Sequence, residues 1–296
     1  MRTNTFCCRP GALPETGQGM KQHRWVTKEP DIPFDLPVLY ENNAIIVVDK
    51  PHFLPTMPRG MWYRSTAVMR LRKLYNSNDI IPAHRLDRMT AGVMVFVRDP
   101  RYRRAYQMLF QNHEADKVYE CLAPMKPAAV PSFGTLRPCC GSPGYPAQPG
   151  HGCTDCSRHY TRHSRACPFP LLRCSRIVKD RGTLQAYEAP GAVNARTLIT
   201  LSANQPAEAV RRGFRAYTLY PFTGKTHQLR VHMNSIGLPI MNDMWYPQVR
   251  EQGYDDFSHP LQLVARQLSF TDPVTHEIRV FRSRYPLSAD TLYIPE

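Results

Sequence analysis

The sequence predicts an α+β fold, a domain of mixed strands and helices, from three observations. Strand-length apolar segments recur, as at 44–48 and 93–97. Other segments carry apolar residues at helical spacing, as at 66–75 and 226–236. The 296 residues are 42% hydrophobic and 21% charged, which is typical of a globular chain and excludes disorder throughout. No apolar segment approaches the roughly 18 residues that a membrane span needs, so no membrane partner is expected.

The elements follow in chain order from these patterns. Residues 43–49 and 92–98 are apolar and end at turn-forming residues, which predicts two buried strands. Residues 66–75 place apolar side chains on one side and basic ones elsewhere, which predicts an amphipathic helix. A second helix is predicted to begin at Thr226 and to stop before Gly237. The remaining expected elements are a helix at 101–111 and strands at 117–122, 198–201, 215–220, 261–270 and 277–281.

Two segments lack such patterns. Residues 1–35 are interpreted as a flexible leader, in which Cys, Pro and Gly recur without periodicity. Residues 134–175 are rich in Cys, Pro and Gly and have too few large aliphatic side chains to build a core of their own. The expected organisation is therefore a domain over 36–290, interrupted by an irregular insertion at 134–175.

The nine cysteines concentrate in this insertion. In a cytoplasmic chain they should be reduced, as free thiols or metal ligands. Cys153 and Cys156 form one Cys-x-x-Cys pair, and with Cys167 and Cys174 they are weak candidates for a zinc site. No second Cys-x-x-Cys pair follows, which favours an insertion without metal. A reading-frame artefact in GC-rich DNA is a third interpretation of the same composition.

The net charge is strongly positive. Lys and Arg number 38 against 24 Asp and Glu, a formal charge of +14 with a pI near 9.5. No basic amphipathic helix or lipidation motif points to a membrane surface, so nucleic acid is the expected partner. The first residues contain no apolar signal core, and the cytoplasm is the expected compartment.

One segment places a carboxylate between two arginines. Asp87 lies between Arg85 and Arg88 in the run Pro-Ala-His-Arg-Leu-Asp-Arg-Met-Thr-Ala-Gly at 82–92. Flanking guanidinium groups favour the ionised form of a carboxylate, and the strand that follows gives the loop a rigid base. A surface cluster of ion pairs with little energetic weight is the alternative interpretation.

A second segment joins a strand end to the start of a helix. Residues 220–233 run Tyr-Pro-Phe-Thr-Gly-Lys-Thr-His-Gln-Leu-Arg-Val-His-Met. Lys225, Thr226 and His227 stand at the helix start, where unpaired backbone N–H groups favour a phosphate. A hydrogen-bonded structural role for His227 is the more common alternative. The spacing of His227 and His232 is not that of a metalloprotease, so no metal is expected here.

A third segment, Lys117-Val118-Tyr119, has little specificity alone, but together the segments resemble the RluA-type pseudouridine synthases. His-Arg-Leu-Asp-Arg-x-Thr-x-Gly at 84–92 is similar to their catalytic motif. Lys-Val-Tyr matches the segment that carries their active-site tyrosine, and residues 223–232 match their third motif almost letter for letter. Residues 43–51 look like their first motif, a strand that ends in Lys-Pro. The resemblance covers about 36–133 and 175–290.

The resemblance implies a pseudouridine synthase catalytic fold, with a mixed, mainly antiparallel sheet and flanking helices and loops. It implies that particular uridines in ribosomal RNA or tRNA are isomerised to pseudouridine, without a cofactor. Asp87 is then the catalytic carboxylate, Arg230 pairs with it, and Tyr119 stacks under the uracil. Arg85 is implied to fill the space that the flipped base leaves. The other RNA-binding candidates are Arg88, Lys225 and His227. A monomer is the default expectation.

The sequence departs from the family pattern at a few positions. Ala91 replaces a usual serine, Leu238 replaces a histidine, and Phe53 and Asn242 stand where glycine is usual. None of these changes removes Asp87, Tyr119 or Arg230, so they are interpreted as variation rather than inactivation. A catalytically silent RNA-binding or ribosome-assembly factor with the same fold is the alternative function.

RNA contacts are expected from the catalytic domain itself. Relatives often carry a small RNA-binding domain ahead of the catalytic one, and residues 1–35 are too few to hold it. A basic and aromatic stretch after the strand at 92–98 could supply contacts, with a solvated helix face as the alternative. Its residues are Arg98, Arg101, Tyr102, Arg103, Arg104 and Tyr106.

Overall fold

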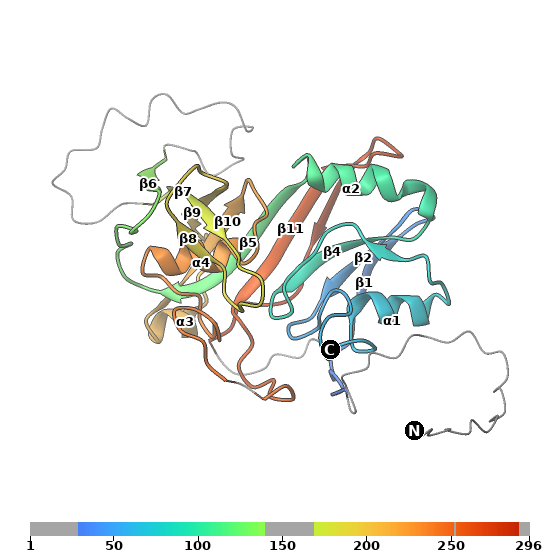
Figure 1. Cartoon of the computed structure of the whole chain (residues 1–296), viewed down its shortest axis with the longest axis horizontal. Coiled ribbons are helices and arrows are strands. Elements are labelled where there is room, and N and C mark those ends of the chain that lie inside the picture. Colours follow the sequence, from blue (N-terminus) through green and yellow to red (C-terminus); the bar gives the residue numbers. More distant parts are fainter. Residues whose placement is uncertain (1–28, 140–168, 252, 290–296) are drawn as a thin grey trace, which may run out of the picture.

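The computed structural model describes residues 29–139, 169–251 and 253–289. These residues form one twelve-stranded sheet with helices against it (Figure 1). The strand order is β1-β2-β4-β11-β5-β10-β9-β7-β6, with β3 paired to β4, β12 to β11 and β8 to β7. Within these described residues only β4 and β11 run parallel, and the other strand pairs are antiparallel. The expected mixed, mainly antiparallel sheet is confirmed.

Each strand that the sequence predicts is present, with its ends moved by a few residues. Five strands, β1, β3, β6, β7 and β8, were not expected. In chain order the strands are β1 (Val38–Glu41), β2 (Ile45–Lys50), β3 (Ile81–Pro82), β4 (Ala91–Val97), β5 (Asp116–Pro124), β6 (Thr135–Pro138), β7 (Leu171–Val178), β8 (Tyr187–Ala189), β9 (Ala195–Leu201), β10 (Phe214–Pro221), β11 (Leu263–Thr271) and β12 (Ile278–Arg282).

The helices are short and begin later than the sequence predicts. The helix expected from residue 101 is a 3₁₀ turn at Pro100–Tyr102 followed by α2 (Arg103–Gln111). The helix expected from Thr226 is α4 (Gln228–Ser235). The others are α1 (Ala67–Leu74), which Thr66 caps, and α3 (Ala207–Arg211). Over the parts of the chain that the structure describes, no helix has the length and apolarity of a membrane span.

The core lies on both faces of β2 and β4, whose residues are all buried. Alternate side chains of these strands pack against α1 on one face and against α2 on the other. This double cover explains why both strands are continuously apolar instead of alternating with polar residues. A third cluster packs α4 against β5, β9 and β10. The loop that precedes β4 therefore leads into a strand that is buried along its whole length.

The ends of the predicted insertion belong to the sheet, so the boundaries 134–175 are wrong as the limits of an irregular segment. Strands β6 and β7 form an antiparallel pair, and Leu171 and Arg173 are fully buried in β7. The Arg173 guanidinium forms an ion pair with Glu188 and donates to the carbonyls of Phe133 and Thr135. Because these contacts are long-range, the composition of the segment does not indicate them.

Three residues near the candidate site have a positive φ. Gly92 has a φ of +120°, and a Cβ there would stand 2.3 Å from the Ala265 carbonyl oxygen across the parallel β4–β11 pair. Phe53 and Asn242, where the family pattern has glycine, have φ values of 66° and 61°. Both positions therefore have the left-handed backbone that glycine adopts most easily, although neither is a glycine.

Candidate active site

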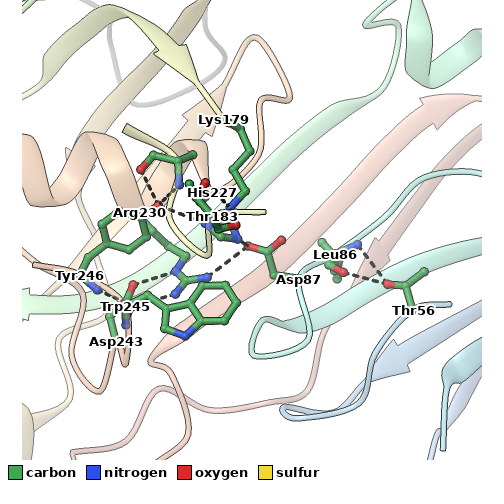
Figure 2. A network of polar contacts seen from close by, with 11 residues as sticks. Thr56, Leu86, Asp87, Lys179, Thr183, His227, Arg230, Asp243, Trp245 and Tyr246 are labelled. Atoms are coloured by element: carbon green, nitrogen blue, oxygen red, sulfur yellow. Dashed lines mark hydrogen bonds and ion pairs between the residues drawn. The ribbon is translucent and has the colours of Figure 1, made fainter. Parts of the chain in front are cut away.

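Asp87 lies in the loop between β3 and β4, and contacts on both sides hold its backbone. The Thr56 hydroxyl donates to the Leu86 carbonyl at 2.8 Å and accepts from the Leu86 N–H at 3.3 Å. After Asp87, its own carbonyl accepts from the Thr90 N–H at 3.1 Å. The Asp87 side chain remains one-third exposed and turns toward α4 (Figure 2). The carboxylate is therefore open to a ligand while its backbone is fixed.

Lys50, the lysine of the Lys-Pro pair at the end of β2, is fully buried beneath this loop. Its ammonium donates to the carbonyls of Leu54 at 2.8 Å, Pro51 at 2.9 Å and Arg88 at 3.3 Å. Burial lowers the pKa of Lys50 to about 7, although the negative charge of Asp87 raises it. The ammonium thus ties the residue after Asp87 to the turn that follows β2.

Arg230 projects from α4 toward Asp87, but its strongest partner is Asp243. The Arg230 Nε and Nη2 atoms donate to the two carboxylate oxygens of Asp243 at 2.8 and 2.7 Å. The third nitrogen, Nη1, lies 3.5 Å from Asp87 Oδ2. The Trp245 and Tyr246 rings flank the guanidinium, with centroids 5.0 and 5.2 Å from Cζ. The expected approach of Arg230 to Asp87 is present, and the sequence analysis missed Asp243.

Asp243 is itself held by the backbone. Its Oδ1 atom accepts from the N–H groups of Trp245 at 2.9 Å and Tyr246 at 3.1 Å. Its side chain is fully buried, so both charges of the Arg230–Asp243 pair are shielded from water. Asp243 lies in the stretch 237–246, which matches the family pattern only weakly, and this weak match was the only indication of Asp243 in the sequence.

His227 precedes α4 with a left-handed φ of 55° and is buried, with Nε2 3.9 Å from Asp87 Oδ2. Its Nδ1 lies 3.1 Å from the Tyr246 hydroxyl, which donates its only proton to the Ala186 carbonyl. Nδ1 must therefore be the protonated nitrogen, and Nε2 faces Asp87 as an acceptor. Burial lowers the pKa of His227 to about 4, so the imidazole is neutral at pH 7.

Tyr119 lies on β5, between β10 and β11 in the sheet. Its ring packs against two of the core clusters, the one around α4 and the one around α1. Burial raises the pKa of the phenol above its usual range, and the charge of Asp87 raises it further. The phenol is therefore protonated at neutral pH and close enough to Asp87 to respond to its charge.

The other predicted RNA-binding residues differ in how exposed they are. Arg85 and Lys225 are exposed, whereas Arg88 is half-buried. Lys179, which the sequence analysis did not single out, follows β7 and donates to the Thr183 hydroxyl at 3.3 Å (Figure 2). Burial lowers the pKa of Lys179, while the nearby charge of Asp87 raises it. Lys179 thus brings a positive charge close to Asp87 from a segment that the sequence analysis did not consider.

The basic stretch after β4 is largely occupied by contacts within the protein. Arg101 pairs with Asp99 at 2.6 Å, and Arg103 pairs with Asp79 at 3.2 Å. Tyr106 is fully buried, and its hydroxyl donates to Asp272 at 2.8 Å, so it is not available to RNA as the sequence analysis expected. The arginines nevertheless remain on the surface, mostly beside carboxylates.

One of the four zinc candidates lies within the described residues, so the proposed zinc site stays a prediction. Cys153, Cys156 and Cys167 lie outside them. Cys174 lies in β7, half-buried, where burial raises the pKa of its thiol. Residues 29–139, 169–251 and 253–289 contain no group of three or more His, Cys, Asp or Glu side chains arranged to hold a metal.

The fold and the site define a class of protein: an α+β chain with a mixed sheet, in which a one-third-exposed aspartate faces a buried arginine. The RNA pseudouridylate synthase family matches residues 44–235, about two-thirds of the chain. The chain therefore belongs to the RNA pseudouridylate synthase family.

Individual relatives agree with this assignment. The chain is 27% identical over 252 residues to the dual-specificity RNA pseudouridine synthase RluA of Haemophilus influenzae, covering 84% of this chain and 93% of that protein. It is 25% identical over 224 residues to the human pseudouridylate synthase RPUSD2, covering 76% of this chain. The chain spans about a third, 32%, of the length of that human relative.

Solved structures share the fold. Human RNA pseudouridylate synthase domain containing 1 aligns with a TM-score of 0.53 at 18% sequence identity, covering 91% of this chain and 94% of that one. Human RNA pseudouridylate synthase domain containing 4 aligns with a TM-score of 0.50 at 20% identity, covering 84% and 88%. The likeness extends over nearly the whole described sheet.

Proposed function

We propose that this protein isomerises particular uridines in RNA, ribosomal RNA or tRNA, to pseudouridine, with Asp87 as the catalytic residue. The observation that carries the proposal is the placement of Asp87, a partly exposed carboxylate 3.5 Å from a buried arginine and close to Tyr119. Residues 36–290 would act as one catalytic domain. The name of the Haemophilus relative, a dual-specificity enzyme, supports RNA as the substrate class without fixing which RNA.

The reaction rearranges atoms without adding any. The bond between N1 of uracil and C1′ of ribose breaks, a bond forms between C5 and C1′, and one proton leaves C5 while N1 gains one. A carboxylate beside the sugar can attack C1′ or act as a base on the ribose, as carboxylates do in glycoside hydrolysis. Asp87 supplies that carboxylate.

The groups around Asp87 would orient it without blocking it. Arg230 is fixed by Asp243 and directs one N–H group toward Asp87. His227 is neutral at pH 7, so it adds no positive charge that would compete with the sugar cation for Asp87. Both features support a carboxylate that is free to interact with charge developing at C1′.

Tyr119 would pack against the uracil. Its ring packs against both the core cluster around α4 and the core cluster around α1. Its raised pKa supports a stacking role better than proton removal from C5, because a protonated phenol is a poor base. Arg85, exposed two residues before Asp87, would enter the space that the flipped base leaves in the RNA.

The test is pseudouridine mapping of total RNA from cells that carry either the wild-type protein or Asp87→Asn. We expect one or a few uridines to lose their modification completely in the variant, because the amide can neither attack C1′ nor accept a proton. Asp79→Asn, which changes an exposed carboxylate of the same type paired with Arg103, should leave the map unchanged. An identical map for wild type and a folded Asp87→Asn protein would refute the proposal.

A further inference from the structure

Arg88 is a half-buried cation without a counterion among the residues that the structure describes. It directly follows Asp87, and Lys50 holds its carbonyl. No residue in the described ranges forms an ion pair with its guanidinium, and Nη1 is shielded from solvent without a hydrogen-bond partner among them. Burial lowers the pKa of Arg88 from its usual value. Shielding a charge without a partner costs stability, so an unpaired cation beside a catalytic loop calls for a ligand.

Two aromatic side chains adjoin this guanidinium. Arg88 Cζ lies 5.4 Å from the centroid of the Trp62 ring, and the Tyr254 ring meets Trp62 edge-on at 6.2 Å. Trp62 is only 7% exposed, whereas Tyr254 is 57% exposed. We call these three residues, Trp62, Arg88 and Tyr254, the Trp62 cluster. They come from three separate segments, so the fold and not local sequence assembles them.

The turn that carries Trp62 is rigid. The N–H and carbonyl groups of Arg59 and Trp62 bond to each other in both directions, at 3.0 and 3.2 Å. The Trp62 ring packs in the core cluster that also contains Leu86, the residue before Asp87. Arg59 is exposed on the same turn and adds a second positive charge. A ligand on the Tyr254 ring would therefore be placed at a fixed position relative to Asp87.

We propose that the Trp62 cluster binds an unpaired nucleotide next to the target uridine, with its base stacked on Tyr254 and its phosphate attracted by Arg88. The inference rests on the proposed function. Flipping one base out of an RNA strand unstacks the neighbouring bases. An unstacked nucleotide offers an aromatic base and an anionic phosphate, which an exposed aromatic ring and a nearby cation can bind. The cluster would thereby hold the RNA strand on one side of Asp87.

The alternative is that the cluster only packs the surface. Tyr254 separates the two interpretations because more than half of its surface is exposed, so its removal should leave the fold intact. A packing role predicts no change in RNA affinity for Tyr254→Ala. A stacking role predicts a loss that depends on the presence of bases in the RNA.

The experiment measures equilibrium binding of two fluorescein-labelled probes of equal charge, a uridine hexanucleotide and the matching ribose-phosphate hexamer without bases. We expect Tyr254→Ala to bind the hexanucleotide about fivefold or more weakly than wild type, the effect of losing one base–aromatic stack. Its affinity for the baseless probe should stay unchanged, and Tyr254→Phe should restore binding. Tyr187→Ala, at a tyrosine of β8 that is 46% exposed, serves as the matched control and should bind both probes as wild type does.

Arg88→Gln tests the phosphate contact. We expect it to weaken both probes and to reduce the slope of log affinity against log salt by about 0.7, the value for one phosphate contact to a single strand. The proposal is wrong if Tyr254→Ala binds the hexanucleotide like wild type, or if it loses affinity for both probes equally. Probe binding requires no turnover, so an unchanged RNA map for Asp87→Asn would refute the proposed reaction and leave this result standing.

Discussion

At the scale of single residues, Arg230 and His227 are each oriented beside Asp87 by a hydrogen bond to another residue. Arg230 donates to Asp243, His227 donates to Tyr246, and both approach Asp87 at 3.5 and 3.9 Å without a hydrogen bond. The charge of Asp243 offsets that of Arg230. On the α4 side, Asp87 therefore faces a balanced ion pair and a neutral histidine.

The Arg230–Asp243 pair should matter for stability as well as for orientation. Asp243→Asn leaves the buried Arg230 guanidinium without its counterion, so we expect the free energy of unfolding to fall by about 3 to 5 kcal/mol. Urea unfolding at pH 7 measures the change. Asp79→Asn removes the carboxylate of an exposed pair with Arg103 and should cost at most about 1 kcal/mol. Equal losses in the two variants would contradict this account of the buried pair.

At the scale of elements, patterns that are local in the chain were predictable and long-range ones were not. The continuous apolar runs of β2 and β4 indicate strands because both faces are covered. Strand β7 was missed because Arg173, a charged residue, occupies a core position, where Glu188 and backbone carbonyls from another segment compensate its charge. The site follows the same division. Asp87 and Arg230 are recognisable in their motifs, but Asp243 acquires its role only when the turn after α4 folds back onto the helix.

The junction of β4 and β11 gives an element-scale prediction. Gly92→Ala should lower the free energy of unfolding by at least about 2 kcal/mol, because it combines a strained φ of +120° with a backbone clash at 2.3 Å. Because Gly92 is the second residue of β4, the strand that follows the Asp87 loop, pseudouridine formation should fall too. Gly224→Ala, where a Cβ would meet nothing within 4 Å, is the matched control. Thermal unfolding of both variants checks the difference, and equal melting temperatures would contradict it.

At the scale of the whole molecule, the fold buries several histidines in their neutral form. Burial lowers the pKa of each well below its ordinary value of 6.5, to about 4 for two of them and about 3 for the other two. They hold together separate parts of the structure through hydrogen bonds or ring contacts with neighbouring segments. These histidines are His52, His84, His227 and His232.

This burial predicts acid sensitivity. Above pH 6.5 the histidines are neutral in both states and have no effect on the pH dependence. Below pH 6.5 these histidines become protonated in the unfolded chain but stay neutral in the folded protein. Each one therefore lowers the free energy of unfolding by about 1.4 kcal/mol per pH unit, until the pH reaches its pKa in the folded protein. Urea unfolding between pH 7 and pH 4 should show a steep fall. His232→Asn should reduce the slope by one proton, whereas His276→Asn, at an exposed position, should not. A flat profile would contradict the prediction.

The pairing of β6 with β7 has a consequence for how this protein can change over evolutionary time. The Cys139 N–H donates to the Pro170 carbonyl at 2.9 Å, so these two residues adjoin although they are far apart in the chain. The Cys139–Pro170 hydrogen bond is at the Leu171 end of β7, roughly 23 Å along the strand from the Val178 end near Lys179, at 3.3 Å per residue. Since the ends are already joined, lengthening the sequence between them adds little entropy cost. Genes encoding this chain can therefore acquire, lose or exchange sequence at this position without redesigning the catalytic centre.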